Sequence, residues 1–396
     1  MTAQIWFWQQ PDWPNFRADP APLTAPLARA HAAAGRLDGI SQALAPDELT
    51  QVADDIRAQT AAATSTLDAA SPASAGSLSP VPPVLPVPPD PLIEVLEDAV
   101  AHCSGWLTAV RLLAWQKRLC HDDRSGPLKL ETGRFRSHSA QVVELVTDGR
   151  KVLWYEAPPA ADIPDQMRAL LDWFNGNRPP QGIPAPADPL LRAGLAHLWF
   201  ETIHPFADGN GRVGRALLDR ALAKAIPPVA RLHGLTIQLQ ADKAGYYAAL
   251  NGAQRGHGAG DATPWLIWFL DAFAHACDRT RARIDAVLIR TRFWSTHANV
   301  SLNARQRKAL SALLAKGPGR SEGGMTPRAY MAITQANNRL TAHRDLADLV
   351  AKRLLVRRGA GRATFYDLTL PGWGSVAAAP PQPATMRSKN SPATPT

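Results

Sequence analysis

The sequence predicts a mainly α-helical protein with one small β-hairpin and a separate module of the winged helix-turn-helix type at its C-terminal end. Apolar residues recur at helical spacing through most of the 396 residues. The pairs Asp188-Pro189 and Thr263-Pro264 each set a capping side chain before a proline, as at a helix start. Around Asp148-Gly149 the pattern changes to the β-branched and aromatic runs of a hairpin.

The positive charge of the chain is confined to one region. Of 43 basic and 34 acidic residues, 13 basic and 4 acidic ones lie in 300–372, which leaves 30 of each sign elsewhere. The net charge of +9 therefore belongs to the C-terminal segment. Such an asymmetry indicates a separate module with a polyanionic partner.

Composition excludes several classes of protein. Cys103, Cys120 and Cys277 are scattered and form no CxxC, so neither a disulfide framework nor a cysteine zinc site is expected. The N-terminus lacks the pattern of a signal peptide. No apolar stretch approaches the roughly 20 residues that span a bilayer. We therefore expect a cytoplasmic protein with no membrane partner.

We expect five parts along the chain. The N-terminal extension starts with aromatic residues that we expect to dock on the main body, and it then becomes helical. A segment with eight prolines follows and is typical of a linker. A helical body, the C-terminal module and a tail of disordered composition complete the chain. The five parts are residues 1–70, 71–91, 92–298, 299–372 and 373–396.

The body and the C-terminal module are each predicted element by element. In the body, helices are expected over 92–119, 165–174, 190–203, from 209 onwards and over 263–293, with the hairpin over 141–156. In the module, helices are expected over 304–315, 327–333 and 338–349, and strands over 354–358 and 363–368. Three helices followed by a hairpin are typical of a winged helix-turn-helix.

One short segment, 204–215, carries the residues that point to chemistry. A helix is expected to begin in Gly209-Asn210-Gly211, where glycines let backbone N–H groups converge on an anion. Arg212 and Arg215 are three positions apart, so both can lie near one edge of the first turn and reach further phosphate oxygens.

Two further side chains complete the segment. A carboxylate beside phosphates is unfavourable without a cation between them, so Asp208 implies Mg²⁺. His204 precedes the loop, and its titration range suits a general base. A base, a metal carboxylate, a phosphate site and two arginines in one segment indicate phosphoryl or nucleotidyl transfer.

Two other kinds of site are disfavoured. The chain has no GxxxxGK[ST], so the segment is not a P-loop. His197, Glu201 and His204 have helical spacing that could suit zinc, but the HExxH order is absent. We expect His197 to be a packed helix residue.

The segment 204–215 matches the signature HPFx[D/E]GNGRxxR without substitution, and the chain resembles the Fic family. Shorter stretches extend the resemblance to the Fic subgroup with an N-terminal extension and a C-terminal winged helix. They are WQQPDWPNF at 8–16, GRFR at 133–136, EAPP at 156–159, WFN at 173–175, AHLWF at 196–200 and TAHRDLADLV at 341–350. The resemblance implies that 92–298 is a Fic catalytic domain and that ATP and Mg²⁺ are its substrate and metal.

The resemblance also implies a role for each residue of the motif. His204 would deprotonate a target hydroxyl that attacks the α-phosphorus, Asp208 would hold Mg²⁺, and Phe206 would anchor the loop. Tyr246 and Tyr247 would lie beside the nucleoside or serve as helix packing residues. The phosphate-binding set would be Gly209, Asn210, Gly211, Arg212 and Arg215, with Arg215 at the γ-phosphate.

The same resemblance assigns roles to two other segments. The hairpin 141–156 would align a target protein by accepting its backbone as an added strand. Extended Fic proteins usually carry an inhibitory [S/T]xxxE[G/N] motif whose Glu pairs with the arginine at Arg215. The stretch here begins at Thr64 and has Asp68 in place of Glu. Because Asp is one methylene shorter, we expect weakened autoinhibition; equal autoAMPylation by the wild type and Asp68→Glu would contradict this.

The leading interpretation is transfer of AMP from ATP to a Ser, Thr or Tyr hydroxyl of a target protein. Transfer of UMP, GMP, phosphate or phosphocholine, or removal of AMP, remain alternatives on the same fold. A different class of protein is a DNA-binding regulator that only senses nucleotide, although sensing needs no base such as His204.

The C-terminal module leaves its partner open between DNA and protein. For DNA, helix 338–349 would be the recognition helix, and Arg357, Arg358 and Arg362 would lie on the wing. For protein, the module would serve docking or dimerisation, so a homodimer is one of the assemblies that the sequence leaves open.

Overall fold

The computed structural model describes residues 5–68, 91–120, 132–145, 151–176, 188–226, 232–255, 260–316 and 324–370. It is mainly helical, as the sequence predicts, and it separates into two compact units, Met1–Asp285 and Ala286–Thr396. The boundary falls within helix α10, Thr263–Thr296. The expected hairpin turn at 146–150, the linker except Pro91 and the tail lie outside the described residues.

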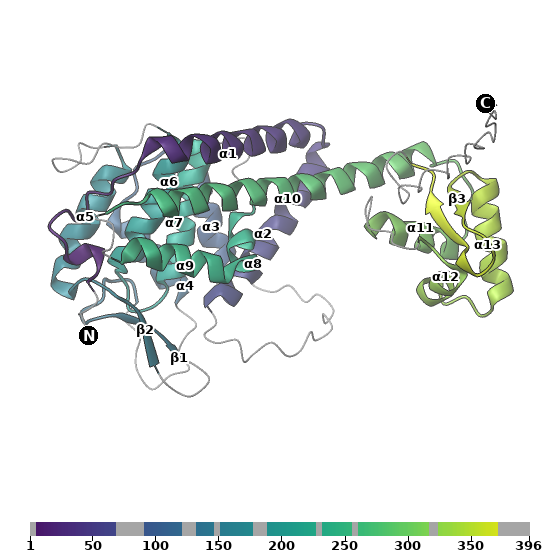
Figure 1. Ribbon diagram of the computed structural model, residues 1–396. Coiled ribbons are helices and arrows are strands. Elements are labelled where there is room, and N and C mark those ends of the chain that lie inside the picture. The colour runs from purple at the N-terminus through teal and green to yellow at the C-terminus, as the bar shows by residue number, and fades with distance from the viewer. Residues whose placement is uncertain are drawn as a thin grey trace, which may run out of the picture. The chain divides into compact units, whose positions relative to one another are not determined.

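The N-terminal extension forms two helices, α1 (Pro20–Ser41) and α2 (Pro46–Asp68). Helix α1 runs beside α10 (Figure 1), and two ion pairs join them. The guanidinium of Arg29 lies 2.7 Å from Asp271, and that of Arg36 lies 3.0 Å from Asp278. Both pairs are exposed, so they fix the register of the two helices more than they stabilise the fold.

The aromatic residues ahead of α1 dock on the body, as predicted. Trp6 and Phe7 are each 1% exposed. The rings of Trp13 and Phe16 meet Trp199 of the body edge-on, with centroids 6.3 and 6.1 Å apart. Such edge contacts between aromatic rings add to the stabilisation that burial provides.

The prediction of a single helix over 92–119 is wrong, because the structure has two helices in this range. Helix α3 covers Pro91–Ala101 and helix α4 covers Ala109–Leu119. The side chain of Asn175 bonds both backbone groups of Leu107, each at 2.8 Å, and so takes the place of helical hydrogen bonds there. Thr108 then caps α4 by accepting from the N–H of Arg111 at 3.3 Å.

A central pair of helices that pack against each other forms the core of the first unit (Figure 1). These are α6 (Pro189–Ile203) and α7 (Asn210–Ala225), and α5 (Ile163–Phe174) packs on α6. Asp188 caps α6 as predicted, because its Oδ1 accepts from the N–H of Leu190 at 2.8 Å. No helix in the described part of the chain has both the length and the apolar composition needed to cross a bilayer.

The hairpin consists of β1 (Gln141–Leu145) and β2 (Lys151–Glu156), paired antiparallel with an irregularity after Val142. A 3₁₀ turn, Ala160–Asp162, leads from the hairpin into α5. Two helices that the sequence analysis did not name, α8 (Leu235–Ala241) and α9 (Lys243–Gln254), follow α7. Helix α9 supports the hairpin, because the side-chain amide of Asn251 donates to the carbonyl of Trp154.

The second unit has the predicted order of three helices and a hairpin. The elements are α11 (Ala304–Lys316), α12 (Pro327–Thr334), α13 (Arg339–Ala351), β3 (Leu355–Arg358) and β4 (Phe365–Leu368). Met325 exchanges two backbone hydrogen bonds with Tyr366, at 2.8 and 3.0 Å, a short bridge that the sequence analysis missed.

A buried carboxylate ties the helices of the second unit together. Asp345 of α13 is 6% exposed and accepts from the hydroxyl of Tyr330 and from the guanidinium of Arg305, each at 2.8 Å. A buried charge is tolerated when it is paired and hydrogen-bonded. The contacts therefore fix α11 and α12 against α13.

Candidate functional site

His204 lies where α6 ends, and its backbone is in the left-handed region, with φ 50° and ψ 60°. Its N–H still completes the helix by donating to the carbonyl of Phe200 at 3.0 Å. A non-glycine residue adopts this conformation only where the surroundings hold it. The turn directs the chain from α6 into the loop before α7.

Arg136 supplies the contacts that hold this turn, and it is 2% exposed. Its guanidinium donates to the carbonyls of His204 at 2.8 Å, His138 at 2.8 Å and Pro158 at 2.6 Å. The backbone N–H of Arg136 also donates to Pro205 at 2.9 Å. The residue thus joins the segments before and after the hairpin to the end of α6.

The side chain of His204 is uncharged at neutral pH. Burial, with the nearby charge of Arg136, lowers the pKa of His204 to about 4, although the Glu201 carbonyl and Asp208 oppose the shift. The residue keeps partial solvent exposure. An imidazole that is unprotonated and reachable can accept a proton from a bound hydroxyl.

The loop after His204 is fixed by one aromatic ring and one amide. Phe206 is fully buried, and its ring lies against Phe135 and Phe200, with centroids 5.9 and 6.2 Å apart. The Asn210 side chain accepts from the N–H of Phe206 at 2.9 Å and donates to its carbonyl at 2.8 Å. The ring of Phe206, the predicted anchor, is therefore held in the core. The side-chain amide of Asn210 closes the loop, so only the backbone of Asn210 remains for a ligand.

Helix α7 begins at this loop with no capping side chain. Gly209 is its N-cap, with φ 85°, and no side chain accepts from the first N–H groups of the helix. Uncapped N–H groups at a helix start, together with the helix dipole, favour an anion. Gly209, Asn210 and Gly211 thus lie at an uncapped helix start, and phosphate binding there stays a prediction.

Asp208 and Arg212 face each other beside this helix start. The carboxylate of Asp208 lies 2.9 Å from the guanidinium of Arg212, and its side chain is 39% exposed. Arg212 also donates to the carbonyl of Leu119 at 2.9 Å. No group of three His, Cys, Asp or Glu residues suited to a metal occurs among the residues described. A single accessible carboxylate nevertheless fits Mg²⁺, which takes one or two carboxylates and fills its shell with water and phosphate oxygens.

The second arginine of the motif lies in the interior. Arg215 is 1% exposed, whereas Arg212 is at the edge of the loop. Close approach of α6 and α7 explains the burial, because a Cβ at Gly214 would collide with the carboxylate of Glu201. The structure therefore does not place the two guanidinium groups together at one exposed edge.

Tyr246 is a packing residue in the described structure. It is 2% exposed, its hydroxyl lies 2.9 Å from Nε2 of His197, and its ring packs on Trp265 and Trp268. Of the two roles open to it, helix packing is the one that these contacts support. His197 is buried in the same cluster, as predicted, and burial lowers its pKa to about 4.

The stretch with Thr64 and Asp68 forms the end of α2 and lies by α9. Tyr247 donates to the carbonyl of Leu67 at 3.4 Å, and Lys243 donates to the carbonyl of Thr66 at 3.4 Å. Thr64 is fully buried, and the side chain of Asp68 lies outside the described residues. Tyr247 thus contacts the segment that resembles the inhibitory motif.

The arginines expected on the wing lie in the second unit. Arg357 and Arg358 are exposed on β3, and Nε of Arg358 lies 3.9 Å from the carboxylate of Asp367. The side chain of Arg362 lies outside the described residues. On α13, Arg339, Leu340, His343 and Arg344 are exposed, and Leu340 is 69% exposed.

The sequence does not reveal one position, Arg136, or one role, that of the Asn210 side chain. Arg136 occurs in a stretch that carries the resemblance, but spacing alone does not indicate a guanidinium that holds the base. The role of Asn210 in closing the loop also depends on its backbone position. No pattern of residue types in the sequence indicates either role.

Two segments of the chain are similar to described families. Residues 106–222 match the Fic/DOC family, and residues 6–72 match a domain of unknown function, DUF4172. A protein adenylyltransferase Fic from Nematostella vectensis is 35% identical over 164 residues, which are 41% of this chain and 30% of that protein. A probable protein adenylyltransferase from Aquifex aeolicus is 30% identical over 102 residues, 26% of this chain and 27% of that protein.

A solved structure of a Fic family protein from Desulfovibrio desulfuricans has a TM-score of 0.47 and 21% sequence identity, with 87% of this chain and 96% of that chain covered. The matched segments span less than a third of the curated relatives. The signature at 204–215 lies inside the segment matched by the family. Residues 106–222, which include that signature, are therefore the part of this chain that resembles the Fic/DOC family.

Proposed function

We propose that the chain is a protein adenylyltransferase, which transfers AMP from Mg-ATP to a Ser, Thr or Tyr hydroxyl of a target protein. The observation that carries this proposal is the uncharged, partly exposed His204 joined by a short, locked loop to an uncapped helix start. Relatives that bear the name protein adenylyltransferase support it.

The geometry supports a direct transfer in one step. The target hydroxyl gives its proton to the imidazole of His204 while its oxygen bonds the α-phosphorus. The bond from the α-phosphorus to the bridging oxygen of the β-phosphate breaks, and pyrophosphate leaves. The N–H groups at the start of α7 hold phosphate oxygens during the step.

Asp208 is the residue that would hold Mg²⁺. When bound, the metal supplies positive charge that screens the polyphosphate. Because Asp208 pairs with Arg212 at 2.9 Å, binding of the metal and the nucleotide would release the guanidinium for a phosphate oxygen.

The hairpin is the proposed docking surface for the target. Its end is anchored to the body, since Trp8 donates to the carbonyl of Glu156 at 2.7 Å and Tyr155 donates to Thr202. Val142 and Leu153 are each 37% exposed on it. A two-stranded sheet has strand edges that an extended target segment can join through backbone hydrogen bonds.

Position-specific labelling of ATP tests the transfer. We expect label from the α-phosphate to be retained on protein and label from the γ-phosphate to leave with pyrophosphate. His204→Ala should abolish retention, whereas Asp165→Ala, an exposed change on α5, should leave it unaltered. Retention of the γ-label would indicate phosphoryl transfer instead, and retention by His204→Ala would exclude the assigned base.

The same assay discriminates the alternative transfers. Unlabelled UTP or GTP that competes fully with ATP, and labelled UMP or GMP on the protein, would redirect the proposal to those nucleotides. Loss of AMP from a premodified protein would indicate the reverse reaction.

A second proposed function is binding of duplex DNA by the C-terminal unit. Arg339 and Arg344 are exposed on α13, and Arg357 is exposed on β3. Basic side chains on a helix and an adjoining hairpin fit the phosphates that flank a groove. The net charge of the segment, 13 basic against 4 acidic residues, favours the same partner.

A gel shift with the full chain tests DNA binding. We expect affinity to fall at least tenfold between about 50 and 200 mM salt, because phosphate contacts release counterions. Arg339→Glu with Arg344→Glu should abolish the shift, and Arg168→Glu, an exposed arginine of the first unit, should not. An absent or salt-independent shift would exclude DNA and favour docking or dimerisation, which gel filtration would detect.

A further inference from the structure

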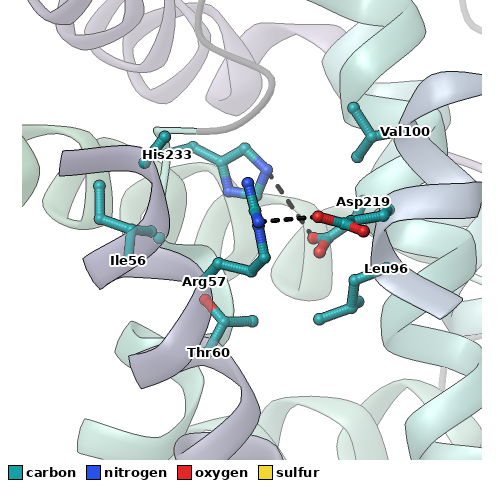
Figure 2. Close-up of a pocket in the computed structure, with 10 residues that line it drawn as sticks. Ile56, Arg57, Thr60, Leu96, Val100, Asp219 and His233 are labelled. Carbon is teal, nitrogen blue, oxygen red and sulfur yellow. Dashed lines mark ion pairs between the residues drawn. The ribbon is translucent and has the colours of Figure 1, made fainter. Parts of the chain in front are cut away.

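A small cavity lies between α2, α3 and α7 in the first unit, apart from the proposed transfer site. Its volume is about 60 Å³, enough for a few waters or for one small organic molecule. One wall is apolar and comes from α2 and α3, with Ala53, Ile56, Leu96 and Val100. The other wall is polar and includes Asp219 of α7 and His233, which face each other in Figure 2.

The carboxyl group of Asp219 is one of the polar groups that line this cavity. Asp219 is 8% exposed, and its Oδ1 has no hydrogen-bond partner among the residues described. Burial raises the pKa of Asp219 to about 7, against the effect of Arg215. An unsatisfied buried carboxyl is costly, so a ligand that donates a hydrogen bond would relieve the cost.

His233 presents a hydrogen-bond donor beside this carboxyl. The residue is 5% exposed, and its Nδ1 accepts from the N–H of Leu235 at 3.1 Å. Burial lowers its pKa to about 4, so the neutral ring carries its proton on Nε2. That atom lies 3.7 Å from Oδ1 of Asp219, too far for a direct hydrogen bond. A third group can therefore bond both residues.

The other charged residues of the cavity are already paired. Arg57 lies 2.7 Å from Glu97 and 3.2 Å from Asp54. Their side chains are more exposed than those of Asp219 and His233, with 28% for Arg57 and 52% for Glu97, so this pair lies toward solvent. Besides the hydroxyl of Thr60, the inner end thus offers one donor, from His233, and one acceptor, from Asp219. The residues that line it include no free cation.

We propose that the cavity binds a small uncharged molecule with a primary amide or lactam at one end and a short apolar group at the other. Its carbonyl accepts from Nε2 of His233, and its N–H donates to Asp219. The apolar group lies against Ile56 and Leu96. Above about pH 7, where Asp219 is ionised, its charge repels an anionic ligand. An ammonium is disfavoured because it would face the N–H of His233.

A ligand bound in the cavity would link the N-terminal extension to α7, the helix that starts at the proposed transfer site. The cavity has α2 on one side and α7 on the other, and α7 begins at Asn210. A bound molecule stabilises the contact between them by mass action. The binding itself does not depend on the proposed transfer activity, so its test needs no substrate.

The probe is 2,2,2-trifluoroacetamide, observed by fluorine NMR with the full chain. We expect saturable line broadening with a dissociation constant on the order of 1 mM, as suits so small a ligand. Trifluoroacetate, which has the same shape and a carboxylate in place of the amide, should show no saturable broadening. Equal broadening by both compounds, or none by either, would overturn the proposal and leave a cavity that holds water only.

Three variants localise the binding. Asp219→Leu removes the acceptor and His233→Phe removes the donor, and each should weaken binding at least tenfold. Asp165→Leu, an exposed change on α5, should not alter it. If one cavity variant fails to fold by circular dichroism, the other decides. Unchanged binding in a folded variant of either residue would place the ligand elsewhere.

Discussion

The surroundings of His204 determine the protonation state of its imidazole. The pKa is lowered to about 4, so above that pH the ring is unprotonated and the base is present. We expect kcat/KM for transfer to stay level from about pH 8 to pH 6 and to fall only toward pH 4. An ordinary histidine would lose half of its base form near pH 6.5. Rates of α-label transfer at saturating Mg²⁺ measure this; an acid limb near 6.5 would contradict it.

Arg136 is a positioning residue, and its charge adds to its contacts. Arg136→Gln removes the positive charge that helps to lower the pKa of His204, and it removes donors to three carbonyl groups. We expect the acid limb of the pH profile to move toward neutral pH and kcat to fall by about 10- to 100-fold.

The pH profile of the Arg136→Gln variant separates positioning from a purely structural role. A loss of rate with an unmoved acid limb would assign Arg136 to stability alone. Arg168→Gln is the matched control, because the side chain of Arg168 is 68% exposed and pairs with an exposed carboxylate.

Asp219 should make stability depend on pH. Its folded pKa is raised from 3.8 to about 7, so the unfolded chain ionises first as the pH rises. The folded state therefore loses stability between about pH 4 and pH 7 and loses no more above that. At pH 8 the free energy of unfolding of Asp219→Asn should exceed that of the wild type by roughly 1–4 kcal/mol, so the variant should unfold at a higher temperature. Near pH 4 the two proteins should unfold at the same temperature.

Thermal unfolding of both proteins across this pH range measures the effect. The buried His233 contributes an opposite trend, but it is present in both proteins and largely cancels in the difference. A constant difference at all pH values would mean that the pKa of Asp219 is the same in the folded and unfolded states.

For single residues, the sequence predicts the chemistry of a side chain better than it predicts how deeply that side chain is buried. The base, the carboxylate, the glycines and the arginines of 204–215 could be predicted because each residue type has a limited chemistry. The burial of Arg215 and of Tyr246 could not be predicted, because it depends on how α6, α7, α9 and α10 meet in space. The tie between Arg136 and His204 joins positions far apart in the chain and leaves no local pattern.

Among the elements, α7 depends on the conformation of its first residue. Gly209 has φ 85°, and a Cβ there would lie 2.9 Å from Sγ of Cys120. Gly209→Ala should cost about 1–2 kcal/mol of unfolding free energy and reduce transfer, because the helix start would shift.

Gly252→Ala is the matched control for the change at Gly209. It lies in α9, where an added Cβ meets no atom within 4 Å, and it should stabilise the protein by up to about 1 kcal/mol. Chemical denaturation of both variants and transfer by each measure the contrast. Equal stability of the two variants would show that the left-handed turn at Gly209 is not required.

Elements were predictable where local signals are strong. Asp188-Pro189 and Thr326-Pro327 place a cap and a proline at helix starts, and both helices occur there. The break between α3 and α4 depends on Asn175, a residue more than fifty positions away. The apolar periodicity does not contain this contact and therefore predicted one continuous helix. Helix α8 is short, and its pattern is too brief to indicate a helix.

For the whole molecule, composition separates a basic C-terminal segment from a neutral remainder, and the described contacts divide the chain into two units. Charge could reveal the segment because it sums over many residues. It could not locate the division within α10, since a continuous helix carries no composition change at that point.

The aromatic arm has a practical consequence for anyone who wishes to study the catalytic part by itself. A polypeptide that starts at residue 106, where similarity to the Fic/DOC family begins, would lack the rings of Trp13 and Phe16 and would bare Trp199 to water. We expect such a fragment to aggregate in light-scattering measurements, whereas a fragment that starts before Trp6 should remain dispersed. Where homology begins is thus not where a foldable piece begins.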